Sequence, residues 1–525
     1  MLKIDKDSSW IFAAAILFPA VIYFFYTPTW ETNDDIAMMS IAHGFGLVAE
    51  SSPNILLSNV LIGYLVCIIP EMFGILGYSI FSVFSIFLAL FFSVYSLRVM
   101  QVRWAFLVIG LIFVFLRPFL FIQFTATAGL LTAAAVLSWI AWGRTEKKIL
   151  LIGGWCLAFL GLLVRPREFV LVLFVAAPML PWRMLFTDIV ARRCGLVFVT
   201  SAAFAFWLDA RAYSAAPWQD IVSMGGNLGQ ILLWIADERL MRQPDVMSQF
   251  QYSINDLRLL KSWFFVDRSL VDPVRLGGAL KDVGPLSDGV YTFGYLGYTG
   301  VRAVLDSHVF PLVIPVGVFL FLRPNRRYAL ACLLCLFAFF LLGAWGRPAP
   351  VRVAFAPLAL LLLTTLTFPR PRFHPVYYAV LCATALAHGA HIAQASRDYQ
   401  ALLSQIRGQL CSFPREVVTI WADSLPSEAI YPVFKVPHEV RQLKFYTLGE
   451  QAYMPFSNSY PLEKSGRGFL TRLRSPEGVL LVARNEYVEL LRGYCQEHWG
   501  LELREMASQE CGVFKIRRMR CAVSD

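Results

Sequence analysis

Two adjacent carboxylates, Asp34 and Asp35, stand just after the first long apolar run of the chain, which covers residues 10–26. A charged side chain beside the hydrocarbon of a membrane is costly unless it is used or paired. One interpretation is structural: Thr32 and Asp35 have the spacing of a helix cap, and Asp in a first turn suits the helix dipole. The other is chemical: a carboxylate at this position faces an active site at the level of the membrane surface.

The composition predicts a polytopic membrane protein. Of the 525 residues, 57% are hydrophobic and only 16% are charged, whereas soluble domains have about 25% charged residues. The net charge of +10 is carried mainly by short loops between apolar runs, which is typical of cytoplasmic loops rather than of a nucleic-acid-binding surface. The first run lacks a small-residue cleavage site, so we expect an uncleaved signal anchor.

The apolar runs and the basic clusters between them predict the topology. We expect the basic clusters to be cytoplasmic, and this is consistent only if one early run does not cross. The run at 54–73 is the best candidate because it contains polar residues such as Asn54, Asn59 and Glu71. About eleven spans remain, with the N-terminus inside and the C-terminus outside. The other runs are 78–97, 104–121, 124–142, 149–164, 168–182, 195–208, 308–322, 328–344, 351–367 and 374–392, and the clusters are Arg98/Arg103, Arg144/Lys147/Lys148, Arg183/Arg192/Arg193, Arg323/Arg326/Arg327 and Arg370/Arg372.

Two regions follow from this topology. Residues 1–392 form a membrane module with an outer loop at 27–77 and a large outer loop at 209–307, and residues 393–525 form a small α/β domain on the outer side. In that domain we expect strands at Glu416–Ala422, Val479–Ala483 and Val513–Ile516 and a helix at Glu486–His498. Its four cysteines predict one or two disulfides with the pairing left open; they are Cys411, Cys495, Cys511 and Cys521.

Arginines at the outer ends of the spans accompany the acidic pair. Their position opposes the usual distribution of positive charge, so they favour an anionic partner such as a phosphate at the membrane surface. The alternative for each one is contact with lipid headgroups or, locally, a pair with Glu168. These outer residues are Arg117, Arg165, Arg167, Arg211, Arg347 and Arg352, with Glu31, His43, Glu50 and the tyrosines Tyr291, Tyr295 and Tyr298 on the same side. The tyrosines either stack on a sugar or anchor the chain at the interface.

The sequence resembles the GT-C superfamily of membrane glycosyltransferases, such as protein O-mannosyltransferases and the aminoarabinose transferases of lipid A. Three segments carry the resemblance: the acidic segment 33–44, the segment from Pro53 to Leu57 with Met72-Phe73-Gly74, and the basic turn Arg165-Pro166-Arg167-Glu168. In the family these correspond to the first outer loop, a juxtamembrane helix and a basic turn after the fifth span. The second acidic residue here is Asp where the family commonly has Glu.

The resemblance implies a polyprenyl-phosphate-linked sugar as donor and inversion at the anomeric carbon. Asp34 is then the expected general base on an acceptor hydroxyl, with Asp35 as second candidate, because burial at the membrane surface raises the pKa of a carboxylate. The arginines would stabilise charge on the leaving lipid phosphate. The phosphate-binding candidates are Arg117, Arg165, Arg167, Arg347 and Arg352, and the supporting candidates are His43, Glu168, Arg211 and Tyr295.

The sequence leaves several points open. We expect no protein metal site, but the use of a divalent cation is left open, as are the sugar and whether the acceptor is a lipid, a glycan or a protein. We expect a bacterial cytoplasmic membrane with the active face outward. The alternatives are a polysaccharide polymerase or ligase acting on lipid-linked glycans, a transporter or flippase, and a scaffolding membrane protein. A transporter would predict ionisable residues within spans and paired repeats, and neither is clear in the sequence.

Overall fold

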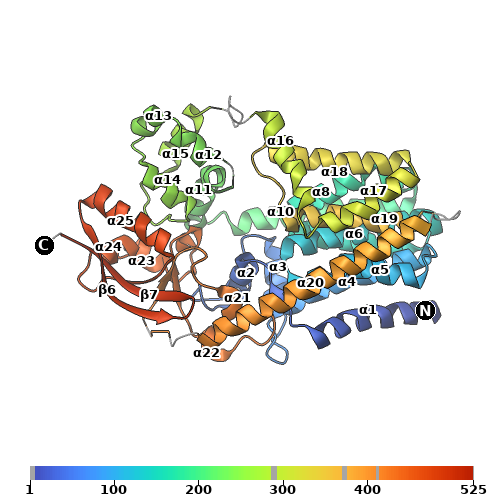
Figure 1. The fold of residues 1–525 in the computed structure, drawn as a ribbon, viewed down its shortest axis with the longest axis horizontal. Coiled ribbons are helices and arrows are strands. Elements are labelled where there is room, and N and C mark those ends of the chain that lie inside the picture. Colours follow the sequence, from blue (N-terminus) through green and yellow to red (C-terminus); the bar gives the residue numbers. More distant parts are fainter. Residues whose placement is uncertain are drawn as a thin grey trace.

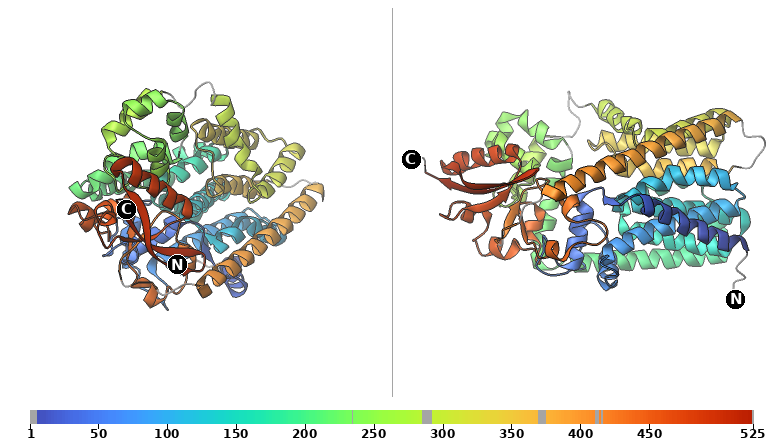
Figure 2. Two further views of the ribbon diagram at one scale, coloured as in Figure 1. Left: turned by 60° about the vertical axis from the view of Figure 1, so that its left-hand side comes forward. Right: turned by 60° about the horizontal axis from the view of Figure 1, so that its bottom comes forward.

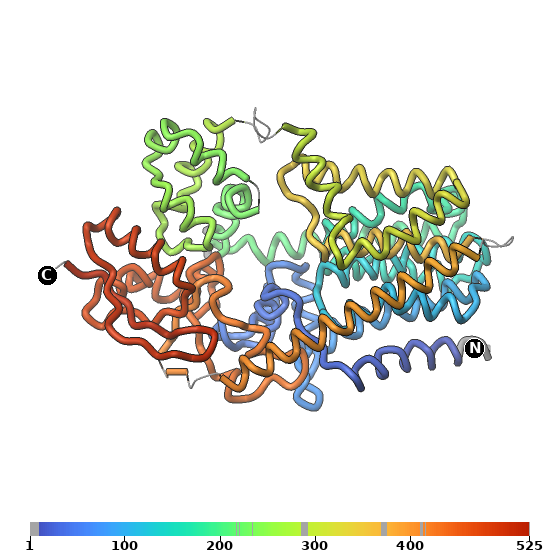
Figure 3. The backbone as a smooth tube through the Cα atoms, in the orientation of Figure 1, coloured from blue at the N-terminus to red at the C-terminus, as the bar shows by residue number. Residues whose placement is uncertain are grey.

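A computed structural model describes residues 6–233, 235–284, 292–368, 375–409, 413–414 and 416–523. Figure 1 shows a bundle of long helices at one end and a mixed helix and sheet region at the other. The N-terminal helix lies along the outside of the bundle, whereas the C-terminal strands lie at the opposite end of the molecule (Figure 3). Four residues considered above, Tyr291, Arg370, Arg372 and Cys411, lie outside the described residues.

The bundle is built around one central helix. α6 (Phe124–Thr145) is buried along its whole apolar length and packs against α7 (Lys148–Val164). Close approach of these two helices depends on glycine, because a Cβ at Gly161 would lie 2.7 Å from Thr132 Oγ1. The remaining bundle helices are α1 (Lys6–Phe25), α4 (Gly77–Val99), α5 (Trp104–Leu120), α8 (Pro166–Ala176) with η1 (Ala177–Met179), α9 (Trp182–Thr187), α10 (Ile189–Ala212), α17 (Phe310–Leu322), α18 (Arg326–Ala344), α19 (Val351–Thr365) and α20 (Pro375–Gln409).

Length and composition make this a multi-pass membrane protein. Five described helices, α4, α6, α10, α18 and α20, are long and apolar enough to cross a membrane. A sixth span results if α17 and the bent segment Phe293–Leu305 before it, which meet at 94°, are counted as one. The expected total of about eleven spans stays a prediction, because the shorter apolar helices have 10–17 residues. α3 (Val60–Ile68) has nine residues, about 14 Å, which agrees with the expectation that the run at 54–73 does not cross.

The first outer segment lies between the bundle and the C-terminal region. Strand β1 (Thr29–Trp30) pairs in parallel with β2 (Phe121–Ile122), and α2 (Asn33–His43) follows at once. The helix begins next to Thr32, as expected, but the Thr32 side chain makes no capping hydrogen bond to the backbone. α2 ends at Gly44, whose left-handed φ of +72° and close contact with Ser51 N both require a residue without a Cβ.

The segment 209–307, which was expected to form one large outer loop, is divided between two neighbours. Helices α11 to α15 share an apolar core with the C-terminal sheet, in which Leu257, Phe264 and Leu276 are buried with Trp421 and Tyr494. α16 (Phe293–Arg302), with η2 (Ala303–Leu305), instead packs against α18 in the bundle. The other helices of the block are α11 (Ala216–Leu233), α12 (Ala236–Met241), α13 (Pro244–Gln249), α14 (Ile254–Lys261) and α15 (Pro273–Asp282), and Figure 2 shows them beside the C-terminal strands.

The C-terminal region is a small α/β domain, as the sequence predicts. Its sheet has the strand order β4-β3-β5-β7-β6, in which β4, β3 and β5 are parallel and β7 and β6 antiparallel. β4 and β6 were not predicted from the sequence. A disulfide joins Cys495 to Cys521, and Cys511 is also disulfide-bonded. The elements are β3 (Val418–Ile420), α21 (Ser427–Ile430), α22 (His438–Arg441), β4 (Phe445–Thr447), η3 (Glu450–Tyr453), α23 (Tyr460–Lys464), α24 (Phe469–Leu473), β5 (Val479–Val482), α25 (Asn485–Trp499), β6 (Glu502–Cys511) and β7 (Phe514–Ala522).

Candidate functional site

One cavity of about 380 Å³ brings together residues that the sequence analysis selected from three separate segments. We call it the basic cavity. It is lined by Asp34 of α2, by the turn between α7 and α8, and by the segment between α18 and α19. Its charged lining residues are Asp34, Arg165, Arg167, Glu168, Arg347, Arg352 and Glu450. Apolar side chains complete the wall, among them Leu56, Leu57, Leu171, Leu342 and Val353.

The arginines of the basic cavity lie at the ends of helices, which position their side chains around the same space. Arg165 is extended (φ −155°, ψ 96°) where α7 stops, and Pro166 then opens α8, which suits a residue without an N–H donor. Arg347 follows Gly346, whose φ of +79° lets the chain leave α18 in a direction that other residues rarely adopt. Arg352 lies in the first turn of α19. The sequence therefore places guanidinium groups at helix termini, where the chain reverses direction.

The electrostatics of the basic cavity is dominated by partly buried arginines. The Arg165 guanidinium donates to the Leu57 carbonyl oxygen at 3.1 Å and lies 5.2 Å from the centre of the Phe124 ring. Burial, together with the charge of Arg167, lowers the pKa of Arg165 to about 10, and the charge of Asp34 acts in the opposite direction. Burial and Arg167 also lower the pKa of Arg347. An anion held between these cations would relieve their mutual repulsion.

Asp35 has a structural place, unlike its neighbour Asp34. Its carboxylate is fully buried and accepts hydrogen bonds from the Tyr78 hydroxyl (2.9 Å), the Phe124 N–H (3.2 Å) and Thr32 Oγ1 (3.2 Å). Burial raises the pKa of Asp35 well above its ordinary value, although these three hydrogen bonds lower it. Asp35 thus ties α2 to the start of α4 and α6 and does not line the basic cavity, which argues against it as the second candidate base.

A second cavity of about 410 Å³ adjoins the first and is lined by α2 and the C-terminal domain. We call it the hydroxyl cavity. Asp34, Ala37, Trp263 and Gln451 line both cavities, so Asp34 stands on their common wall. On the C-terminal side the lining residues follow the ends of β3 and β4; they include Ala422, Asp423, Thr447, Leu448 and Gly449. Ligands of α/β folds commonly bind at this end of parallel strands.

Three residues that line the basic cavity were not anticipated from the sequence: Trp263, Glu450 and Gln451. Burial raises the pKa of Glu450, and the charge of Asp34 raises it further. No short motif marks these positions, since they reach Asp34 only through the packing of distant segments. Glu168 was anticipated: it is 2% exposed and lines the cavity, and its Oε1 has no hydrogen-bond partner among the described residues.

Besides Asp35, four of the predicted site residues do not line the basic cavity in the part of the chain that the structure describes. Arg117 is buried and forms a two-bond ion pair with Glu31 at 2.9 and 3.0 Å. His43 Nε2 accepts the Tyr78 N–H at 3.1 Å, and burial lowers the pKa of His43 to about 4. Arg211 ends α10, and Tyr295 on α16 is 56% exposed. The phosphate-binding role expected for Arg117 and the supporting roles expected for the other three stay predictions, and these side chains lie away from the basic cavity.

The donor set near Asp34 does not suggest a metal site. Within the described ranges, the one group of three close metal-binding side chains is Asp256, Glu497 and His498, on α14 and α25. Asp256 already accepts the Ser253 N–H at 2.9 Å and pairs with His498 Nε2 at 2.8 Å. Among the described residues, the carboxylates of the basic cavity form no such group.

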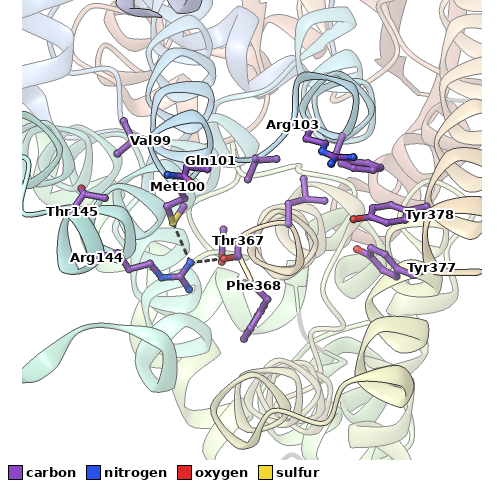
Figure 4. A pocket seen from close by; sticks show the side chains of 13 residues that line it. Val99, Met100, Gln101, Arg103, Arg144, Thr145, Thr367, Phe368, Tyr377 and Tyr378 are labelled. Atoms are coloured by element: carbon purple, nitrogen blue, oxygen red, sulfur yellow. Dashed lines mark hydrogen bonds between the residues drawn. The ribbon is translucent and has the colours of Figure 1, made fainter. Parts of the chain in front are cut away.

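A third cavity, of about 470 Å³, lies at the other end of α6 (Figure 4). Arg144 there donates to Met100 Sδ at 3.5 Å and to the Thr367 carbonyl oxygen, and Arg103 also lines the cavity. Its lining residues include no carboxylate. This cavity therefore has cationic groups but no candidate base, unlike the cavity at Asp34.

Comparison with known proteins gives a distant structural likeness. No protein-family model matches the chain, and no curated protein matches it. Two crystal structures of ArnT from Cupriavidus metallidurans are similar, each with a TM-score of 0.38. The one bound to undecaprenyl phosphate has 12% identity over 97% of both chains, and the apo one has 13% identity over 98% of both chains.

Proposed function

We propose that this protein is a membrane glycosyltransferase that moves a sugar from a polyprenyl-phosphate donor to an acceptor hydroxyl, with inversion at the anomeric carbon. The observation that carries the proposal is the basic cavity itself, where one carboxylate, Asp34, shares a space of about 380 Å³ with Arg165, Arg167, Arg347 and Arg352. A carboxylate and clustered guanidinium groups are what transfer away from a phosphate requires: a base for the nucleophile and cations for the leaving group.

The proposed donor lies with its phosphate among the arginines. Guanidinium groups bind phosphate oxygens through paired, charge-assisted hydrogen bonds. The apolar wall of the basic cavity, including Leu56, Leu171 and Val353, suits the first isoprene units, and the rest of the lipid would continue between the helices into the bilayer. The sugar would then point toward Asp34 and the hydroxyl cavity.

The reaction is a single displacement. The acceptor oxygen attacks the anomeric carbon from the side opposite the phosphate and forms the new glycosidic C–O bond. The bond from that carbon to the phosphate oxygen breaks, and its electron pair stays on the polyprenyl phosphate. Asp34 takes the acceptor proton, and the arginines stabilise the charge that grows on the leaving phosphate. Attack opposite the leaving group inverts the anomeric configuration.

The proposed orientation places the Asp34 cavities and the C-terminal domain on the outer face of a bacterial cytoplasmic membrane. Basic residues at the far end of the bundle, such as Arg103 and Arg144 beside the third cavity, support this orientation, because cytoplasmic loops carry an excess of positive charge.

A transfer assay tests the proposal. Purified wild-type and Asp34→Asn proteins would be incubated with a panel of polyprenyl-phosphate sugars and a membrane extract as acceptor source, and the remaining donor would be measured. We expect the wild type to consume at least one donor and the variant to be slower by about 100-fold or more. Asp398→Asn, an exposed change on α20, is the matched control. Failure of the folded wild type to consume any donor would contradict the proposal.

A further inference from the structure

Three buried hydroxyl groups around the hydroxyl cavity have no hydrogen-bond partner among the residues that the structure describes. Ser40, Tyr431 and Thr447 line this cavity and are only 1%, 3% and 7% exposed. Their hydroxyl oxygens have no partner among the described residues. An unsatisfied buried polar group costs about 1–3 kcal/mol, and buried polar side chains are usually paired. Three such groups around one cavity indicate a ligand that supplies the missing hydrogen bonds.

The charged residues that line the same cavity are already paired, apart from Asp34. Asp423 forms an ion pair with Arg484 and accepts the Tyr487 hydroxyl at 3.0 Å. Lys261 donates to Asp237 and to the Ile231 carbonyl oxygen, both at 3.0 Å. The unsatisfied hydrogen-bonding capacity of the hydroxyl cavity is therefore neutral, in contrast with the cationic groups that line the basic cavity.

Aromatic side chains form another part of the wall. Trp263 lines the cavity with its backbone in the left-handed region (φ +63°), a conformation that is uncommon for a bulky residue. Tyr487 also lines the cavity and stacks on Trp421, with ring centres 5.3 Å apart. Aromatic faces beside neutral hydroxyl groups match a sugar ring, which has apolar C–H faces and hydroxyl groups at its edge.

We propose that the hydroxyl cavity binds a neutral saccharide ring, and that this ring belongs to the acceptor. The acceptor part of the inference rests on the proposed function, because Asp34 is the residue that the two cavities share. A sugar hydroxyl that extends past Ala37 would reach the carboxylate that removes its proton. An acceptor recognised by an anionic headgroup is disfavoured, because the one cationic side chain lining this cavity within the described ranges is Lys261, which is paired.

Isosteric removal of the unpartnered hydroxyl groups tests the inference in the full-length protein. In Tyr431→Phe/Thr447→Val the side-chain shapes are kept and no existing hydrogen bond between described residues is lost, so the melting temperature should be unchanged or slightly higher. Binding of methyl α-glucoside, α-mannoside and α-galactoside would be followed by saturation-transfer NMR, with methyl phosphate as the anionic probe. Tyr64→Phe, an exposed change on α3, is the matched control.

We expect at least one methyl glycoside to bind the wild type and the control, and the double variant to bind it about 3- to 10-fold more weakly for each lost hydroxyl. Equal binding by the double variant, binding of methyl phosphate alone, or no binding of any glycoside would overturn the inference. Donor consumption measured on the same preparations separates the two proposals. If glycoside binding depends on the hydroxyl groups but no donor is consumed, the proposed function is contradicted and the saccharide site stands. If donor is consumed but no glycoside binds, the saccharide site is contradicted and the proposed function stands.

Discussion

The two cavities that meet at Asp34 differ in the kind of group they leave unsatisfied. The basic cavity holds four arginines within reach of three carboxylates, whereas the hydroxyl cavity holds three neutral hydroxyl groups without partners in the described structure. The first suits a phosphate and the second suits a sugar. Under the proposed function, one carboxylate serves two ligands of different chemistry, and residues that line only one of the two cavities can be changed separately.

The largest effect is expected from the basic cavity. In Arg167→Gln/Arg347→Gln, two cationic donors are lost, and each hydrogen bond to a charged group is worth about 1.5–3 kcal/mol. The donor KM should therefore rise by about 100-fold or more, while methyl glycoside binding stays as in the wild type. Initial rates against donor concentration give the KM. Arg211→Gln, outside both cavities, should leave it unchanged, and a matching fall in glycoside binding would show that the cavities are not separable.

Removal of Arg117 should act on stability rather than on donor binding. Arg117→Ala would leave the mostly buried Glu31 without the partner that now holds it at 2.9 and 3.0 Å. Breaking a buried ion pair from one side costs about 3–5 kcal/mol. A strongly lowered melting temperature in detergent is the expected result. If Arg117→Ala keeps the wild-type melting temperature and has a raised donor KM, Arg117 would instead be a phosphate-binding residue.

A pH dependence of stability should arise from Asp35. Burial raises its folded-state pKa well above the ordinary value of 3.8, so its contribution to stability is present below pH 3.8 and is lost as the pH rises toward the folded-state pKa. The fall can reach about 1.4 kcal/mol per pH unit. Asp35→Asn should flatten this part of the curve, because an amide can accept from Tyr78 and Phe124 and donate to Thr32. Thermal unfolding across pH measures it, and identical pH curves for the two proteins would refute the assignment.

The smallest effect is expected on the donor KM when a residue of the hydroxyl cavity is changed. Thr447→Val removes a hydroxyl that lines only the hydroxyl cavity. The donor KM should stay within about twofold of the wild type, since the donor phosphate is proposed to bind the arginines. The same rate measurements, made at fixed acceptor, would check this. A donor KM raised as far as in the arginine variants would mean that both substrates share one cavity.

The sequence predicted the fold class and most charged residues of the basic cavity, but not the hydroxyl cavity. It predicted the helical membrane module, the C-terminal α/β domain and the meeting of Asp34 with the arginines at 165, 167, 347 and 352, because each stands at the end of an apolar run on the same predicted side. The same rule did not anticipate the ion pair that Arg117 forms with Glu31. The hydroxyl cavity was out of reach, because Ser40, Tyr431 and Thr447 are ordinary core residues until packing reveals that their hydroxyl groups lack partners.

The most direct test of the account compares two neighbouring carboxylates in one assay. Initial rates for wild type, Asp34→Asn and Asp35→Asn would give kcat and donor KM for each protein. We predict that Asp34→Asn loses about 100- to 10,000-fold in kcat with little change in donor KM, as removal of a general base requires, while Asp35→Asn keeps a kcat near that of the wild type. Loss of kcat in folded Asp35→Asn with activity retained in Asp34→Asn would contradict the account, because the base would then lie on the buried side of α2.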